Sequence, residues 1–384
     1  MKTSIVFTGD IGFDKHMDKK WEDENLLSQS VLDFFHGADH VCANVEGALY
    51  EVPEGSNHGT FFHVMDPAAT SVLDKIRADI WSIGNNHITD ARRDGIVSTQ
   101  NIAAQIGCRT FGAGLNIAEA SRPLYLEDAG GIGMIGVTYM NDCIPATDTE
   151  PGIFRWDDME LIAKRIAEIK AKCCWCVVVA HGGEEFAAMP LPYTRDRYLK
   201  YLEMGADVVV GHHPHVPENY EVLENGKIIF YSLGNFIFDT NYQREHLYTD
   251  IGVLLKLKFT EEKVEFEAVG IQIIRGDERI DTAPLPDIFT NIPAEEFERL
   301  APLAAKAFVL EEQRKMIFLK PQRFGDFTQA DWDKYFATET SDSFCAGAHQ
   351  DFRTIVPYSL KADAGQWKQS KLEKVRNYIL RQFE

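Results

Sequence analysis

The chain has 384 residues, of which 45% are hydrophobic and 26% charged, which is typical of a globular protein with one large domain and an extension, or with two domains. Its formal net charge of −20 excludes nucleic acid and anionic membrane surfaces as main partners, because both require a basic protein face. No apolar run approaches the length of a signal-peptide core or a membrane span, so we expect a cytoplasmic protein without a membrane segment.

Short apolar runs alternate with helix-like segments through most of the chain, which is the pattern of an α/β fold. Helices are expected at 26–35 and 68–76, where apolar residues recur at helical spacing. Strands are expected, in chain order, at residues 5–7, 40–44, 80–83, 132–137, 176–180, 206–210 and 228–232.

The pattern changes after residue 250. Two long alternating runs, 251–259 and 264–274, are separated by four polar residues and predict a hairpin with one buried face. Beyond about residue 285 the chain becomes helix-rich and aromatic, and it ends in a predicted amphipathic helix over 367–383. We therefore predict a main domain of residues 1–285 and a helix-rich C-terminal extension of residues 286–384.

The seven cysteines do not fit a disulfide framework, because their number is odd and the chain is long. Cys173, Cys174 and Cys176 could indicate a metal or redox site. They lead directly into an expected strand, however, and we interpret them as apolar filler at its start.

Polar side chains follow most of the predicted strands at glycine-containing turns, where open α/β sheets bind ligands. They form, in chain order, the motifs Gly9-Asp10, Asn44-Val-Glu46, Asn85-Asn-His87 with Asp90, His181-Gly-Gly-Glu-Glu185, Gly211-His-His-Pro-His215 and Ser232-Leu-Gly-Asn235. Each motif has a structural alternative: Asp10 could cap a helix, Asn85 and Asn86 could hold a turn, and His181 could be a satisfied buried histidine. A shared metal site explains the whole set, because imidazole is a common metal ligand and a buried Glu46 needs a partner.

The order of these motifs resembles the CapA/PgsA capsule-synthesis family of the calcineurin-like metallophosphoesterase superfamily. The resemblance runs from about residue 5 to residue 239 and includes the near-continuous stretch 204–239. It implies an α/β fold with a four-layer α-β-β-α sandwich, to which the helix-rich C-terminal extension is added.

The resemblance also implies roles for individual residues. Asp10 and His215 would hold one divalent metal ion, and Asn86, His181 and His213 a second, with Glu46 touching both. This set of oxygen and imidazole ligands suits Mn, Zn or Fe. His87, grouped with Asp90 as catalytic, would protonate the leaving oxygen or stabilise the transition state. The expected substrate-binding residues are Asn44, Glu185 and Asn235, and Glu185 could instead orient a histidine ligand.

The sequence departs from the family at three positions. Gly12 stands where the superfamily has the histidine of Asp-x-His, so His16 or a water could replace that ligand, or the first metal position could be weak or empty. Gly182 and Thr194 stand where the family usually carries Trp and Gln, which leaves the substrate preference open.

Three functions remain in competition. The first is a metal-dependent hydrolase that attacks a phosphoester with a metal-activated water. The second is a capsule or poly-γ-glutamate biosynthesis protein that acts on an amide or a polymer chain, and the third is a non-catalytic assembly factor. The expected partner is a small-molecule or polymer substrate, and the oligomeric state is left open.

Overall fold

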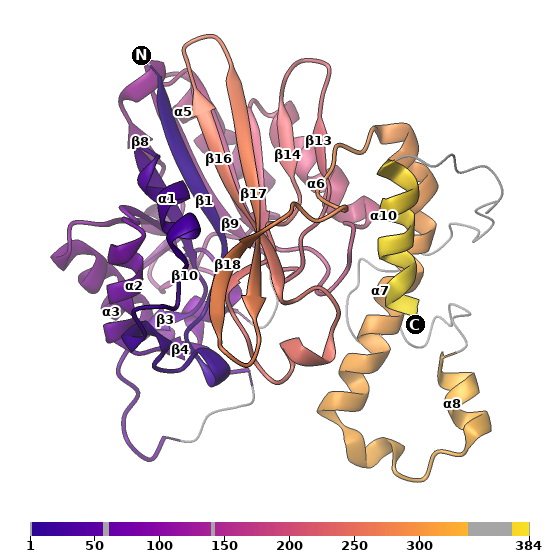
Figure 1. The fold of residues 1–384 in the computed structure, drawn as a ribbon. Coiled ribbons are helices and arrows are strands. Elements are labelled where there is room, and N and C mark those ends of the chain that lie inside the picture. Colours follow the sequence, from indigo (N-terminus) through magenta and orange to yellow (C-terminus); the bar gives the residue numbers. More distant parts are fainter. Residues whose placement is uncertain (1, 57–60, 140–142, 337–370, 384) are drawn as a thin grey trace.

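The computed structural model describes residues 2–56, 61–139, 143–336 and 371–383, and two mixed β-sheets form its centre (Figure 1). The first sheet has the order β18-β17-β16-β1-β2-β5-β6, and β15 also pairs with β1. Its strands are β1 (Thr3–Ile11), β2 (His40–Val45), β5 (Ile80–Ser82), β6 (Arg109–Phe111), β15 (Asn235–Ile237), β16 (Ile251–Phe259), β17 (Val264–Ile274) and β18 (Arg279–Ala283).

The second sheet has the order β13-β14-β12-β11-β9-β8. Its strands are β8 (Leu124–Leu126), β9 (Ile132–Thr138), β11 (Trp175–His181), β12 (Val208–His212), β13 (Tyr220–Val222) and β14 (Ile228–Phe230). Two short pairs stand apart, β3 (Ala48–Leu49) with β4 (Val64–Met65) and β7 (Ala113–Gly114) with β10 (Gly152–Ile153). In both large sheets the central strands are parallel, so their carboxyl ends lie at one edge.

Helices cover the outer face of each sheet, and apolar side chains fill the space between the sheets. The inner core joins Phe7 of β1 to Val179 of β11 and Val210 of β12. The helices are α1 (Gln29–His36), α2 (Thr70–Lys75) and α3 (Arg92–Gln105) on the first sheet, α5 (Met159–Lys170) and α6 (Pro192–Glu203) on the second, and the short α4 (Ile117–Ala120). The predicted α/β fold with four α-β-β-α layers is confirmed.

All seven predicted strands are present, but some boundaries differ. β1 continues to Ile11, so Asp10 lies inside a strand and does not cap a helix. The expected hairpin is formed by β16 and β17. From Val264 to Ala268, β17 alternates between half-buried and exposed residues. The prediction of one buried face is wrong for β16, because the second sheet covers one side of that strand and the helical layer covers the other.

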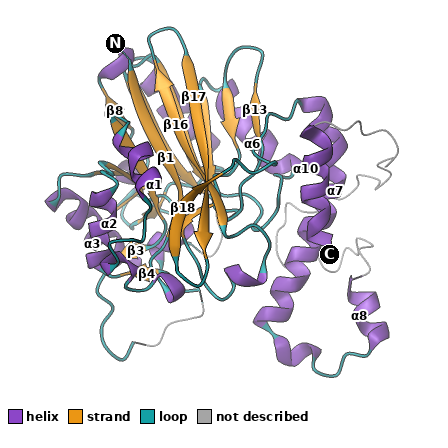
Figure 2. Ribbon diagram, in the orientation of Figure 1, coloured by secondary structure: helices purple, strands orange, loops and turns teal. Residues whose placement is uncertain are grey.

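The C-terminal extension contains α7 (Ala294–Leu319), α8 (Gln329–Phe336) and α10 (Lys371–Leu380). α7 and α10 lie side by side at one end of the sandwich, and Figure 2 shows helices in this part of the molecule. Their apolar side chains pack against the loop residues Ala187–Leu191 rather than joining the core between the sheets. The first part of the predicted terminal helix, residues 367–370, lies outside the described residues, and the domain boundary at residue 285 stays a prediction.

Two further expectations concern the cysteines and the membrane. Cys176 is buried in β11, as expected of apolar filler, whereas Cys174 is exposed, so that interpretation does not extend to it. Within the described part of the chain, no helix combines the length and the apolar character needed to span a lipid bilayer.

Candidate metal centre

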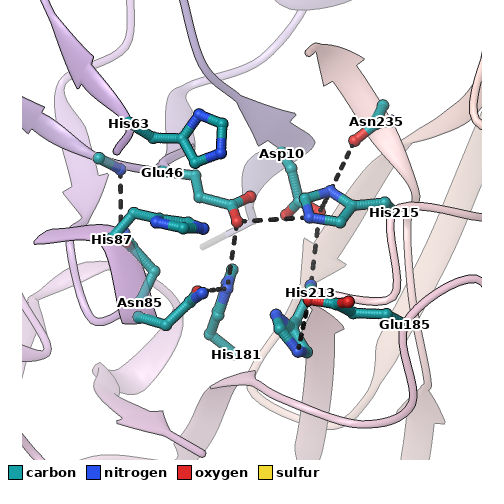
Figure 3. A network of polar contacts seen from close by, with 12 residues as sticks. Asp10, Glu46, His63, Asn85, His87, His181, Glu185, His213, His215 and Asn235 are labelled. Atoms are coloured by element: carbon teal, nitrogen blue, oxygen red, sulfur yellow. Dashed lines mark hydrogen bonds and ion pairs between the residues drawn. The ribbon is translucent and has the colours of Figure 1, made fainter. Parts of the chain in front are cut away.

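The polar residues that follow the strands meet at one edge of the two sheets (Figure 3). Asp10 comes from β1, Glu46 follows β2, His181 ends β11, and His213 and His215 follow β12. They form two overlapping groups, one of Glu46, His181 and His213 and one of Asp10, Glu46 and His215. Within each group the potential ligand atoms lie within 4.8 Å of one another, and every residue is buried. Glu46 belongs to both groups.

The Glu46 carboxylate is the least satisfied polar group in the cluster. Its side chain is 0% exposed, and neither oxygen has a hydrogen-bond partner within the described residues. Histidine nitrogens lie nearby at 3.5 Å (His181 Nε2) and 3.6 Å (His215 Nε2) from its Oε1 atom. Burial, followed by the charge of Asp10, raises its pKa well above the usual value. A buried carboxylate without donors is costly unless a cation compensates its charge, so the position fits a metal ion.

The loop after β12 holds two histidines in unusual backbone conformations. The φ angle is 99° at His213 and 59° at His215, on either side of Pro214. Non-glycine residues rarely adopt positive φ, and such strain is concentrated at functional sites. Burial lowers the pKa of His213 to about 4, so its ring is neutral, which is the form that binds metals.

The group of Asp10, Glu46 and His215 forms the Asp10 side of the cluster, and two asparagines hydrogen-bond to it. Asn44 Nδ2 donates a hydrogen bond of 2.8 Å to Asp10 Oδ1, and Asn235 Oδ1 lies 2.9 Å from Nδ1 of His215. Both asparagines are buried and lie outside the cavity lining, and their expected substrate contact stays a prediction. Burial lowers the pKa of His215, but Glu46 and Asp10 outweigh it and raise the pKa to about 9.

The space beside Gly12 is filled by an aromatic ring. A Cβ atom at this position would lie 2.6 Å from ring carbons of Phe238, so the histidine of the superfamily does not fit here. The expected substitute, His16, points elsewhere, because its Nε2 atom lies 2.7 Å from Asn241 Oδ1. The structure therefore places three candidate ligands, and no histidine from the first motif, on the Asp10 side.

The His181 side of the cluster comprises His181, His213 and Asn86, and it contains ring nitrogen atoms without hydrogen-bond partners in the described structure. His181 Nε2 lies 2.9 Å from Asn86 Oδ1, so the two predicted ligands are in contact. Within residues 2–56, 61–139, 143–336 and 371–383, the Nδ1 atoms of His181 and His213 have no hydrogen-bond partner. Asn85 is structural, because its Oδ1 atom accepts the Ile88 amide at 2.9 Å and caps the 3₁₀ helix Asn86–Thr89.

Two histidine–aspartate pairs stand at the mouth of the cluster. His87 Nδ1 lies 2.9 Å from Asp90 Oδ2, and His63 Nδ1 lies 2.6 Å from Asp14 Oδ2. The two rings meet edge to face at 4.3 Å, and the His63 amide also donates to Asp90 at 2.7 Å. Burial and the neighbouring His63 lower the pKa of His87. The sequence pattern did not indicate His63, because this residue precedes the short strand β4 instead of following a predicted strand.

A cavity of about 190 Å³ opens beside the cluster. Its walls include His63, Asn86, His87, Asp90 and His215 from the sandwich, together with Glu185 and the aromatic residues Phe61, Phe186, Phe238 and Tyr242. Glu185 Oε1 lies 3.9 Å from His213 Nε2, and its Oε2 atom lies 2.5 Å from the ammonium group of Lys315. Glu185 therefore faces the candidate ligand His213 and the cavity at the same time.

The other two departures from the family lie behind the cavity wall. A Cβ atom on Gly182 would lie 2.6 Å from Tyr139 and 2.8 Å from Trp156, so the usual tryptophan does not fit at position 182. The Thr194 hydroxyl donates to Glu184 Oε1 at 2.8 Å, in a buried contact. Neither position lines the cavity.

The donor set fits a divalent metal ion. Carboxylate oxygens, imidazole nitrogens and an amide oxygen together suit Mn²⁺, Zn²⁺ or Fe²⁺ better than a thiol-seeking ion. The two oxygens of Glu46, which have no hydrogen-bond partner in the described structure, are the atoms that such an ion would satisfy. The buried groups could therefore hold a metal ion, as predicted from the sequence.

The family model and the curated relatives that match this chain both point to capsule synthesis proteins. Residues 4–240 match the family model described as bacterial capsule synthesis protein PGA_cap. The PGA biosynthesis protein CapA of Bacillus subtilis (strain 168) is 30% identical over 247 residues, which cover 63% of this chain and 64% of that protein. The capsule biosynthesis protein CapA of Bacillus anthracis is 25% identical over 255 residues, with 63% and 61% covered. The chain spans less than two thirds of the length of these relatives.

A solved structure also aligns with the chain. The protein TT1561 of Thermus thermophilus is 12% identical, and the alignment covers 70% of this chain and 99% of that one with a TM-score of 0.39. A similarity of this size supports no conclusion about the site.

Proposed function

This chain belongs to the bacterial capsule synthesis protein family PGA_cap, and from that premise we propose that its buried cluster is the centre of a metal-dependent hydrolase. The observation that carries the proposal is Glu46, a fully buried carboxylate without a hydrogen-bond donor in the described chain that is shared by both ligand groups. Divalent metal ions bound there would neutralise charge on the substrate and activate a water for attack. Asp10, His181, His213, His215 and Asn86 would complete the ligand set.

The proposed proton donor is His87. In hydrolysis the water oxygen bonds to the phosphorus or carbonyl carbon, the bond to the leaving group breaks, and the leaving atom takes up a proton. Because the pKa of His87 is lowered, its ring is neutral and can take the proton that the attacking water releases. The Asp90 carboxylate at 2.9 Å would stabilise the charged ring, which then gives this proton to the leaving atom. Asp90 would thus orient and stabilise His87 without touching the substrate.

Two kinds of bond are candidates for cleavage, a phosphoester and an amide. A phosphoester fits the charge-neutralising role of the metal ligands and the intact Asn86–His87 pair. An amide in an anionic polymer such as poly-γ-glutamate is favoured by the family and by the two CapA relatives, whose names refer to PGA and capsule biosynthesis. Both reactions would use the same residues, because each needs a polarised centre, a water and a proton donor.

The test is metal content together with turnover on one purified sample. Elemental analysis after incubation with Mn²⁺ or Zn²⁺ gives the number of ions per chain, and the same sample is assayed on a phosphodiester, a phosphomonoester and poly-γ-glutamate. Bound metal with turnover on one substrate class supports the hydrolase and identifies the bond. Absence of both metal and turnover contradicts it and favours a non-catalytic assembly factor.

A further inference from the structure

One wall of the cavity comes from the C-terminal extension rather than from the sandwich. Lys315 and Leu319 of α7 line the cavity together with Glu185, His87 and His215. These two residues lie outside residues 4–240, the part of the chain that matches the family. The extension therefore contributes a cation to the cavity, and this cation lies outside both the matched residues and the strand-end motifs.

Specific contacts fix α7 at this wall. Glu311, one helical turn before Lys315, lies 2.7 Å from Nδ1 of His246, and both side chains are buried. The ring of Phe318 packs against Tyr242 at 4.8 Å, and Tyr242 also lines the cavity. Residues at i and i+4 share a helix face, so the contacts that seat Glu311 also direct Lys315 toward the cavity.

The ammonium group lies within a chain of charges that ends at the ligand cluster. Lys315 Nζ is 2.5 Å from Glu185 Oε2, and Glu185 Oε1 is 3.9 Å from Nε2 of the ligand His213. Burial raises the pKa of Glu185, but the charge of Lys315 outweighs it and lowers the pKa below its usual range. An ammonium is a compact charge with three donors, which suits a phosphate or carboxylate group.

We infer that Lys315 binds an anionic group of the substrate next to the bond that is cleaved, so that the C-terminal extension forms part of the substrate site. This inference rests on the proposed function and names its substrate class. Both candidate substrates carry such a group, either the non-bridging oxygens of a phosphoester or the free carboxylate of a γ-linked glutamate. On binding, the anion would share the ammonium with Glu185, which remains directed at His213.

The experiment compares Lys315→Gln with Lys315→Arg and with a control, Lys320→Gln. Lys320 is exposed, follows the end of α7 and does not line the cavity. Titration calorimetry on metal-loaded protein measures the affinity for inorganic phosphate in one arm and for a tri-γ-glutamate peptide in the other. Metal content and the thermal midpoint are measured on the same samples.

We expect Lys315→Gln to weaken one of the two probes by roughly 10- to 100-fold, the size of a lost charge-assisted hydrogen bond, with metal content unchanged. Lys315→Arg should restore most of the affinity, and Lys320→Gln should bind like the unmodified chain. The arm that weakens identifies phosphate or carboxylate as the ligand. Unchanged affinity in both arms overturns the inference, as does a parallel loss of metal and thermal stability, which would make the ion pair purely structural. Because binding is measured without turnover, an inactive protein that still shows the Lys315 effect contradicts only the proposed function.

Discussion

The two sides of the metal cluster differ in how much the protein itself satisfies their ligands. On the Asp10 side, Asn44 and Asn235 hydrogen-bond to Asp10 and His215, and Phe238 fills the space beside Gly12. The His181 side comprises His181, His213 and Asn86, and two of its ring nitrogens have no partner in the described structure. We therefore expect a metal ion to bind more tightly on the His181 side. At Gly12, the space that a histidine side chain would need is filled by the ring of Phe238.

Glu46→Gln should have the largest effect on metal binding and turnover, because Glu46 belongs to both sides of the cluster. Removing the shared carboxylate charge should abolish metal binding on both sides and reduce turnover to background, as measured by elemental analysis and assay. The fold should survive, because the variant replaces a buried carboxyl group that lacks hydrogen-bond donors with an amide of similar size. Its thermal midpoint, measured in chelator beside the unmodified chain, should therefore not fall. The matched control is Glu267→Gln, an exposed residue paired with Lys258. Full metal retention in Glu46→Gln would remove Glu46 from the ligand set.

A second variant separates the proton donor from the ligands. His87→Ala should lower kcat roughly 10²- to 10⁴-fold, the range for loss of a general acid, while the metal content of both sides stays unchanged. His16→Ala serves as the control, because the His16 ring contacts Asn241 outside the cluster. Equal loss of metal and activity in His87→Ala would assign this residue to the metal instead. Loss of metal in His16→Ala would make His16 the missing ligand.

Asn235→Ala should affect one side only. The variant removes the partner of His215 Nδ1, and loss of such an orienting contact typically weakens metal binding about 10- to 100-fold. A two-site metal titration should show the weaker site weakened further while the tighter site is unaffected. Asn291→Ala, an exposed position that accepts the Val222 amide, is the control. Equal weakening of both sites would mean that the two sides do not bind metal independently.

The smallest effect is expected from restoring the missing ligand. Gly12→His alone should destabilise the fold by about 1–3 kcal/mol, because its side chain meets Phe238. Combining it with Phe238→Ala makes room for the ring, and this double variant should bind metal on the Asp10 side about tenfold more tightly than Phe238→Ala alone. Denaturant unfolding measures the first effect and metal titration the second. If the double variant gains no affinity, the lost histidine does not explain the difference between the two sides.

The sequence predicted the fold and the family because their signals are local or ordered along the chain. Apolar runs identified every predicted strand, and alternation identified the β16–β17 hairpin, since both patterns reflect burial on the faces of a sheet. The motif order identified the capsule synthesis family, which the family match confirms. Burial on both faces of β16 could not be predicted, because it depends on the second sheet that covers this strand.

The sequence predicted those residues of the candidate site that lie at or just after the end of a strand. Asp10, Glu46, His181, His213 and His215 lie at the shared edge of the sheets because parallel strands bring their carboxyl ends together, and the sequence alone indicated this. Only the tertiary structure decided that Asn44 and Asn235 contact Asp10 and His215, that Phe238 fills the space beside Gly12, and that His63 and Lys315 line the cavity. Each of these depends on contacts between segments far apart in the chain. Local sequence patterns contain no information about such contacts, because the packing of one layer on another determines them.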